Sequence, residues 1–187
     1  FDAISHKAME KLHAFNEQDI ANTVWAYARV GHSSPRLFDA IAHKAMDRLD
    51  DFNSQAIANT LWAYATMGHS SPKLFDSILI KAMENLDTFN SQAVANTVWA
   101  YASIGYKIDS IKLDAFVSKA ASVLDEFKVQ GIINLLWSLA VFDFKDVDAV
   151  DPLFSKITND YNSLAYDEDD YRKLSKEELS QLHQVSL

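Results

Sequence analysis

The sequence predicts an all-α protein, an α-solenoid of two-helix repeats of 37–38 residues. The first observation is a fixed period, because the tryptophans follow one another at intervals of 37, 37 and 38 residues. A period of this length indicates stacked units, none of which buries its apolar face alone. The second observation is that glycine and proline number only 4 and 3, which argues against an all-β fold with many tight turns.

The repeated segment surrounds each tryptophan. It reads FNEQDIANTVWAYARVG from Phe15, FNSQAIANTLWAYATMG from Phe52 and FNSQAVANTVWAYASIG from Phe89, and a weaker copy, FKVQGIINLLWSLAVFD, starts at Phe127. Residues 1–15 match only the later part of a unit's first helix. We therefore expect the array to continue upstream and this chain to be an internal piece of a longer protein.

Each unit reads as two helices, as the second unit illustrates. Ser34 supplies a hydroxyl for the N-cap and Pro35 occupies the first helical position, so the first helix is expected from Pro35 to Asp50. Asn53 can cap a second helix over residues 54–67. Gly68 ends that helix, since glycine readily adopts the left-handed conformation there.

Helical periodicity divides the second helix into two faces. The predicted apolar face holds Ile57, Ala58, Leu61, Trp62 and Ala65. The predicted opposite face holds Gln55, Asn59, Ala63 and Thr66. A tryptophan among alanines favours a core position over a base-stacking platform. The tyrosines at 27, 64 and 101 are expected at the edge of the apolar face, with the hydroxyl groups exposed.

Residues 1–142 are predicted to form the helical array, with about 3.5–4 units, and residues 143–187 a degenerate capping repeat and an acidic linker towards a missing C-terminal domain. In this second part, a helix is expected to start at Pro152 and to end near Leu164. An acidic loop follows at residues 167–170. A last helix is expected from Ser175, where Ser175 and Glu178 fit a capping box.

Several classes of function find no support in these residues. The chain has no cysteine, its glycines fit no phosphate-binding loop, and no metal-binding motif is present. Histidines such as His32 and His69 follow capping glycines, where a helix dipole favours them. The most apolar run has 11 residues, and a membrane span needs about 20. We expect no enzyme activity, cofactor, metal, membrane or small-molecule substrate.

The charge is unevenly placed. Residues 1–140 carry 12 basic and 15 acidic residues, and residues 141–187 carry 5 and 11, within a total net charge of −9. Bulk charge therefore gives no support to a nucleic-acid partner, since such proteins usually present a basic face. Specific RNA binding would need a local basic stripe.

A lysine ladder on the first helices is the visible candidate for that stripe. Stacked units lie about 8–10 Å apart, so these ammonium groups can track a phosphate backbone. The alternative is a solvated row that acids three residues further on neutralise. The ladder consists of Lys7, Lys44, Lys81 and Lys119.

Two amide ladders recur on the second helices, four residues apart and hence on one face. One interpretation is a row of groups that hydrogen-bond unpaired bases, as in binders that read one base per repeat. The other is that each amide ties its helix to the backbone of the neighbouring unit. The ladders are Gln18, Gln55, Gln92 and Gln130, and Asn22, Asn59, Asn96 and Asn134.

Positions that vary between units are candidates for specificity, although an unconstrained surface varies in the same way. They are Glu17/Ser54/Ser91/Val129, Asp19/Ala56/Ala93/Gly131 and Arg29/Thr66/Ser103/Val141. From these three sets we select Thr66 and Ser103 as candidate RNA-binding residues, together with Gln55, Asn59, Gln92, Asn96 and the four lysines.

The motif F-x-x-Q-x-[IV]-A-N-x-x-W-A-Y-A-x-x-G, followed by a Ser-Pro loop and an amphipathic helix, resembles the octotricopeptide repeat. It is also similar to the helical repeats of FAST-kinase-like and RAP-domain proteins, and LSQLHQVSL at residues 179–187 looks like the linker before a RAP domain. The resemblance implies an organellar protein, in mitochondria or chloroplasts, that acts on RNA stability, processing or translation. It also implies that any nuclease-like activity would lie beyond residue 187.

Two functions follow as hypotheses. The first is an RNA-binding segment, with single-stranded RNA on the concave face of the solenoid. The alternative is a protein–protein interaction scaffold, whose concave face binds a peptide or a helix.

Overall fold

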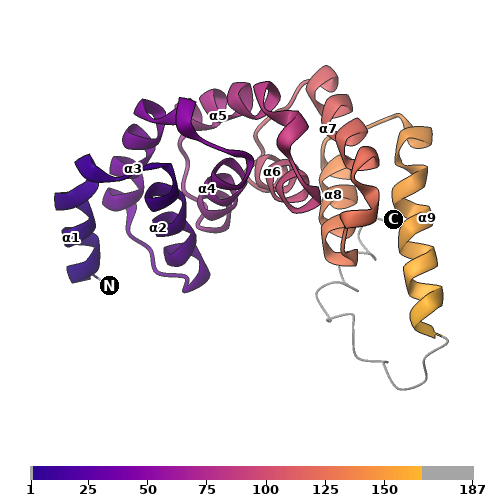
Figure 1. Cartoon of the computed structure of the whole chain (residues 1–187), viewed down its shortest axis with the longest axis horizontal. Coiled ribbons are helices and arrows are strands. Elements are labelled where there is room, and N and C mark those ends of the chain that lie inside the picture. The colour runs from indigo at the N-terminus through magenta and orange to yellow at the C-terminus, as the bar shows by residue number, and fades with distance from the viewer. Residues whose placement is uncertain (1, 166–187) are drawn as a thin grey trace.

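The computed structural model describes residues 2–165, and side chains as far as residue 160. Helical hairpins stack side by side into an arch (Figure 1), so the predicted all-α solenoid is confirmed. The α-helices are α1 (Asp2–Lys11), α2 (Glu17–Arg29), α3 (Pro35–Asp47), α4 (Ser54–Thr66), α5 (Pro72–Glu84), α6 (Ser91–Ser103), α7 (Ser110–Ser122), α8 (Val129–Val141) and α9 (Val147–Ala165). Short 3₁₀ turns are η1 (Leu12–Ala14), η2 (Leu49–Asp51), η3 (Leu86–Thr88) and η4 (Leu124–Glu126).

The arch has two layers, which we call the outer helices (α1, α3, α5, α7 and α9) and the inner helices (α2, α4, α6 and α8). Neighbouring inner helices pack closely along their length, whereas successive outer helices touch far less. Buried alanines such as Ala58, Ala63 and Ala95 let the inner helices approach. Larger buried side chains such as Phe38 and Phe75 fill the outer layer. The stack therefore curves with α4 and α6 on its inner side and α5 on its outer side (Figure 1).

Local capping residues fix where the inner helices begin and end. The Asn53 side chain accepts a hydrogen bond from the Ala56 amide at 2.8 Å, as predicted, and Asn16 and Asn90 cap their helices in the same way. Gly68 has a φ of 60°, and the amide that follows it donates to the Tyr64 carbonyl at 2.9 Å. In the fourth unit Asp143 takes the glycine's place with a φ of 55°.

The outer helix of the second unit starts where it is predicted, but its N-cap and its C-terminal end differ from the prediction. Pro35 begins α3, but the Ser34 hydroxyl makes no capping bond and donates instead to the Ser5 hydroxyl at 3.1 Å. The helix ends at Asp47, and the tighter turn η2 replaces the expected last turn. This turn leads to Phe52, which is buried, so the chain turns inwards there.

The tyrosine hydroxyl groups lie in the core, contrary to the expectation that they are exposed. Tyr64 and Tyr101 are fully buried, and their hydroxyls donate to the Phe38 and Phe75 carbonyls at 2.7 and 2.8 Å. Each bond joins an inner helix to the outer helix of the same unit. Burial, with a smaller contribution from a nearby aspartate, raises the pKa of both phenols far above the ordinary value.

The last described helix, α9, continues the outer layer by packing against α7 and α8. It begins at Val147 rather than at Pro152, which lies inside it, because the Asp146 carboxylate caps the Ala149 amide at 3.1 Å. The helix ends at Ala165, close to the predicted end near Leu164. The acidic loop, the helix from Ser175 and the linker-like segment 179–187 lie outside the described residues, and the division at residue 142 stays a prediction.

Within residues 2–165, no helix combines the length and apolarity that a membrane crossing requires.

Candidate nucleic-acid interface

Each inner helix leaves one narrow stripe uncovered. In α4, Ala63 and Thr60 are fully buried along with Ile57, Ala58 and Leu61 of the predicted apolar face, because the helix is packed against an outer helix and two inner neighbours. The accessible positions are spaced four, three and four residues apart, so they lie within about 60° of one another around the helix. We call these positions the inner stripe: Gln18, Asn22, Trp25 and Arg29; Gln55, Asn59, Trp62 and Thr66; Gln92, Asn96, Trp99 and Ser103; Gln130, Asn134, Trp137 and Val141.

The tryptophans belong to this stripe, and the predicted core position holds only in part, because Trp62 and Trp99 pack against the core and yet remain partly exposed. Trp25 is 42% exposed, and Trp62, Trp99 and Trp137 are partly exposed. Trp62 lies at the edge of the apolar face, only about 20° around the helix from Gln55 and about 40° from Thr66. The helical wheel therefore already places Trp62 beside the amides. A division of the helix into two equal faces obscures this position. The Arg29 guanidinium lies 5.7 Å from the Trp25 ring centroid, a distance at which a cation is attracted to the indole face.

The amide ladders of the first three units make no hydrogen bond with any residue that the structure describes. This holds for Gln18, Asn22, Gln55, Asn59, Gln92 and Asn96. The interpretation in which each amide ties its helix to the next unit therefore fails for these six. Only in the fourth unit does an amide pair bond, Gln130 donating to the Asn134 side-chain oxygen at 2.8 Å. The free carboxamides each offer a donor and an acceptor to a ligand.

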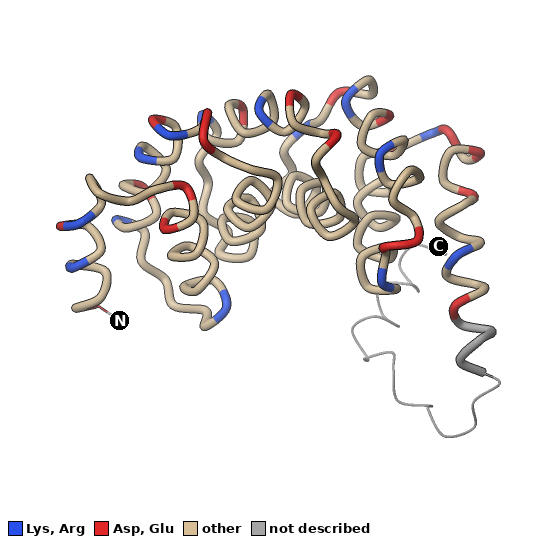
Figure 2. The backbone as a smooth tube through the Cα atoms, in the orientation of Figure 1, with Lys and Arg blue, Asp and Glu red and all other residues tan. Residues whose placement is uncertain are grey.

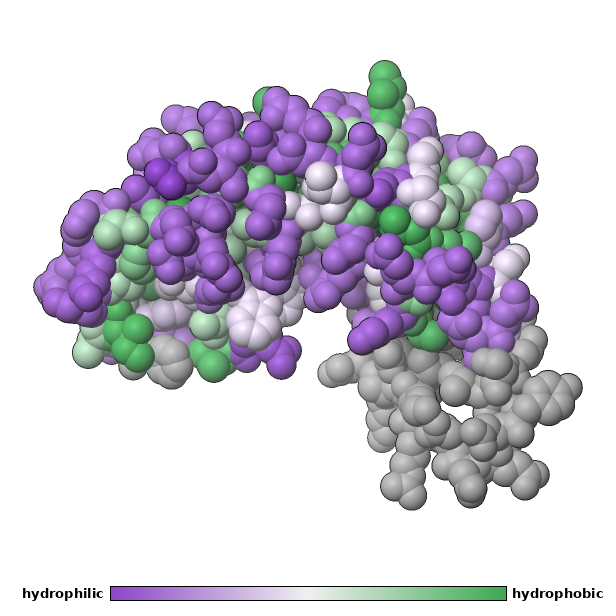
Figure 3. Space-filling model, viewed as in Figure 1, coloured by the Kyte–Doolittle hydropathy of each residue, from purple (hydrophilic) through white to green (hydrophobic). Residues whose placement is uncertain are grey.

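Charge is absent from three of the four inner helices, and the fourth, α2, carries Glu17, Asp19 and Arg29. The helices α4, α6 and α8 contain no charged residue, whereas α3, α5 and α7 carry both signs. Figure 2 shows α4 and α6 without a charged position and the outer rim dotted with both colours. Figure 3 shows hydrophilic residues over that rim and a hollow beneath the arch. A strand lying in this hollow would meet amides, indoles and hydroxyls.

The lysine ladder lies on the outer helices, away from the inner stripe. Lys44 donates to the His13 carbonyl at 3.1 Å and Lys119 to the Asp87 carbonyl at 2.9 Å, each reaching back to the preceding unit's turn. Lys81 lies 3.9 Å from the Asp50 carboxylate, at the same position of its preceding unit, and its side chain is 15% exposed. Lys7 pairs with Glu10 at 2.7 Å. We therefore assign Lys44, Lys81 and Lys119 to the joints between units.

The variable positions divide into three kinds. The Ser54 and Ser91 hydroxyls donate to the Thr88 and Glu126 carbonyls and join adjacent units. The next set, including Ala56 and Ala93, is buried in the second and third units, so it cannot present a side chain to a ligand there. The last set is exposed at the end of the inner stripe and consists of Arg29, Thr66, Ser103 and Val141.

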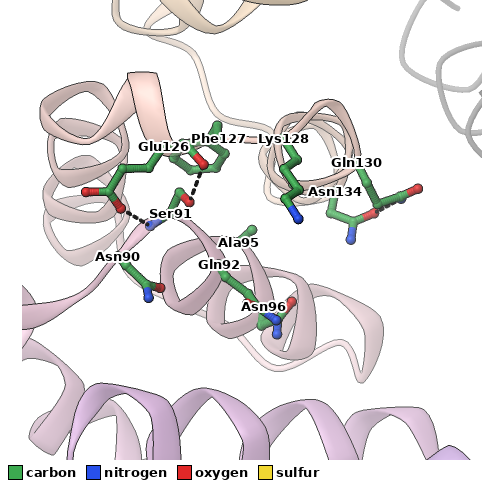
Figure 4. A pocket seen from close by; sticks show the side chains of 11 residues that line it. Asn90, Ser91, Gln92, Ala95, Asn96, Glu126, Phe127, Lys128, Gln130 and Asn134 are labelled. Carbon is green, nitrogen blue, oxygen red and sulfur yellow. Dashed lines mark hydrogen bonds between the residues drawn. The ribbon is translucent and has the colours of Figure 1, made fainter. Parts of the chain in front are cut away.

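A cleft of about 390 Å³ opens between α6 and α8 (Figure 4). Its walls include the free amides of Gln92 and Asn96 and the bonded pair of Gln130 and Asn134. A smaller cleft of about 140 Å³ lies between α2 and α4, beside Gln18 and Gln55. The inner stripe is therefore hollowed between units, where a flat group can enter.

The histidines carry pairing roles that the sequence did not predict. His69 lies 2.9 Å from the Asp39 carboxylate and His32 lies 3.5 Å from that of Asp2, so each ring closes a hairpin onto its outer helix. In the third unit Tyr106 donates to Asp76 in the same manner. Within residues 2–165, no cluster of three or more acidic or histidine side chains could hold a metal ion.

A family model described as RNA-editing substrate-binding complex 6 protein matches residues 2–175. The chain belongs to this family. The match spans the array and most of the segment after it, whereas the resemblance to octotricopeptide, RAP-domain and FAST-kinase-like proteins rested on the repeat motif within residues 1–142 and on residues 179–187. That assignment is wrong. In this structure the motif's Gln, Asn and Trp lie along the accessible side of each inner helix. No curated protein matches the chain significantly.

The family gives the function in outline. Its members are components of a complex named for binding RNA-editing substrates, so an RNA-related organellar function is supported. That complex acts in the mitochondrion, and the chloroplast alternative has no support. The family is one of complex subunits, and no catalytic family is indicated.

Proposed function

We propose that this array binds single-stranded RNA within the RNA-editing substrate-binding complex. The strand runs along the inner stripe, and each unit offers its carboxamides and indole to unpaired bases. One observation carries the proposal: the amides of the first three units are accessible and make no hydrogen bond within the described part of the chain, and partly exposed indoles lie in register with them. Carboxamides satisfy base edges, and an indole stacks on any base.

The chemistry of the inner stripe implies an unusual kind of RNA binding. Basic grooves derive affinity from counterion release, and for single strands log K changes by about −0.7 per phosphate contact per unit of log salt. The charge-free helices α4, α6 and α8 supply no such contact from within the stripe. Affinity should come from stacking and neutral hydrogen bonds, so it should depend little on salt. Duplex RNA should bind poorly because its base edges are occupied.

A protein scaffold is the second candidate. The net charge of −9 and the neutral hollow favour it, because neither attracts a polyanion. An extended segment of another subunit would also satisfy paired amide donors and acceptors. The family's complex contains further proteins, so a partner of this kind is available.

The deciding experiment measures binding of labelled single-stranded RNA to the purified chain by fluorescence anisotropy. The variant Asn59→Ala/Asn96→Ala should weaken the affinity by about tenfold, since two neutral hydrogen bonds of roughly 0.5–1.5 kcal/mol each are lost. The matched control, Lys7→Ala/Lys73→Ala, removes two exposed outer charges and should leave the affinity unchanged. Equal affinities for both variants would refute the inner stripe as the RNA site. Absence of any RNA binding would favour the scaffold.

A further inference from the structure

The fourth unit departs from the repeat at the mouth of the larger cleft. In the first three units the residue before each inner helix is asparagine, and its side chain caps the helix. In the fourth unit this residue is Lys128, which makes no side-chain capping bond because an ammonium group only donates. Replacing a good N-cap costs about 1 kcal/mol of helix stability. A residue that replaces the capping asparagine and lowers helix stability is expected at a functional site.

The Lys128 side chain has no bonding partner among the described residues. It is exposed, and no ion pair or hydrogen bond holds its ammonium group. The adjacent acid, Glu126, is turned away and accepts a bond from the Ser91 amide at 3.3 Å. Figure 4 shows the Lys128 ammonium pointing towards the space between α6 and α8. Lys128 therefore differs from Lys44, Lys81 and Lys119, which are engaged in joints between units.

The walls below that ammonium group carry neutral amides and one acid, Glu126, whose carboxylate is bonded to the Ser91 amide. Gln92 and Asn96 line the cleft from α6, with carboxamides free of bonds inside the described chain. Asn134 faces them from α8. The volume of about 390 Å³ falls within the range of roughly 300–1,000 Å³ that small-molecule sites occupy. One cation at the rim and amides inside suit a group with one anionic end and one flat, hydrogen-bonding end.

We propose that the cleft between α6 and α8 holds one nucleotide of the bound RNA strand, with its phosphate at Lys128 and its base against Gln92 and Asn96. This inference rests on the proposed RNA-binding function and deepens it. The cleft between α2 and α4 is smaller and none of its lining residues is a lysine, whereas this cleft receives one base and anchors the backbone beside it. It therefore fixes the register of the strand on the array and is the position where base identity counts most.

Lys128→Asn is the sharpest test, because it restores the asparagine that the other units use as a cap. The variant should melt at a higher temperature than the parent chain and yet bind single-stranded RNA on the order of threefold to tenfold more weakly. The slope of log K against log salt should become shallower by about 0.7, the value for one lost phosphate contact. A misfolded variant cannot gain stability while losing affinity. Lys73→Asn, on an exposed outer position, is the matched control and should change neither the affinity nor the slope.

The base contact is tested with labelled homo-oligomers of A, C and U. The parent chain should discriminate among them, and Gln92→Ala/Asn96→Ala should reduce that discrimination while leaving the melting temperature unchanged. If the parent chain binds RNA and Asn59→Ala weakens it, but Lys128→Asn and Gln92→Ala/Asn96→Ala bind as the parent does, the cleft proposal is overturned and the RNA-binding function stands. If the parent chain binds none of the oligomers, both proposals fall.

Discussion

The outer helices carry most of the array's charge and use three of their lysines to join adjacent units, whereas the inner helices α4, α6 and α8 carry no charge and leave most of their amides unbonded. Both layers contain residue ladders that repeat in every unit. Repetition alone therefore cannot separate a structural ladder from a binding ladder. The two kinds of ladder are distinguished by whether the polar groups hydrogen-bond to other residues of the protein.

Curvature explains the difference between the layers. On the outer side the units diverge, so a long side chain such as Lys119 can bridge to the preceding unit's turn. On the inner side alanines bring the helices together, and the polar residues of the inner stripe lie on the accessible side of each helix. Those residues point into the hollow, where only water or a ligand can bond them.

The largest expected effect compares one aromatic residue from each layer. Phe38→Ala should lower the free energy of unfolding by about 3–5 kcal/mol, because the ring is buried and packs 5.0 Å from the Tyr64 ring. Trp25→Ala should cost about 1 kcal/mol or less, because the indole is 42% exposed. Urea denaturation followed by circular dichroism measures both. Similar losses for the two variants would contradict the placement of Trp25 on the inner stripe.

A smaller effect is expected at high pH. The pKa of the Tyr64 and Tyr101 phenols is raised in the folded chain, chiefly by burial, while the unfolded phenols ionise near pH 10. Stability is therefore complete below pH 10 and is lost above it, by about 1.4 kcal/mol for each tyrosine at pH 11. Denaturation at pH 8 and pH 11 measures the loss, and Tyr64→Phe should reduce its pH-dependent part. An unchanged dependence in that variant would argue that Tyr64 ionises freely.

The smallest effect concerns the lysine joints. Lys119→Met keeps the aliphatic stem and removes the bond to the Asp87 carbonyl, so it should destabilise the array by about 1 kcal/mol while RNA affinity stays the same. Lys7→Met, whose ammonium pairs only with an exposed glutamate, should change neither quantity measurably. A large loss of RNA affinity in Lys119→Met with unchanged stability would return the lysines to a phosphate-tracking role.

The sequence was sufficient for the helices because their signals are local. Asn53, Gly68 and Pro35 each act on the backbone within one turn, and their predicted positions are confirmed. The start of α9 was wrongly predicted at Pro152, because the helix begins at Val147 and is capped by Asp146. The match to the family model covers 174 residues, whereas the resemblance that suggested another family rested on a repeated motif within residues 1–142.

The period by itself determined that units stack in register, since identical apolar faces bury best against each other. Only the tertiary structure decided which ladder is bonded and which is free. A helix packed on three sides exposes a stripe rather than half its surface, so Trp62 and Asn59 face the hollow while Ala63 is buried. Hydrogen-bond partners more than 20 residues away cannot be predicted from the neighbouring sequence. Examples are the Phe38 carbonyl for Tyr64 and the His13 carbonyl for Lys44.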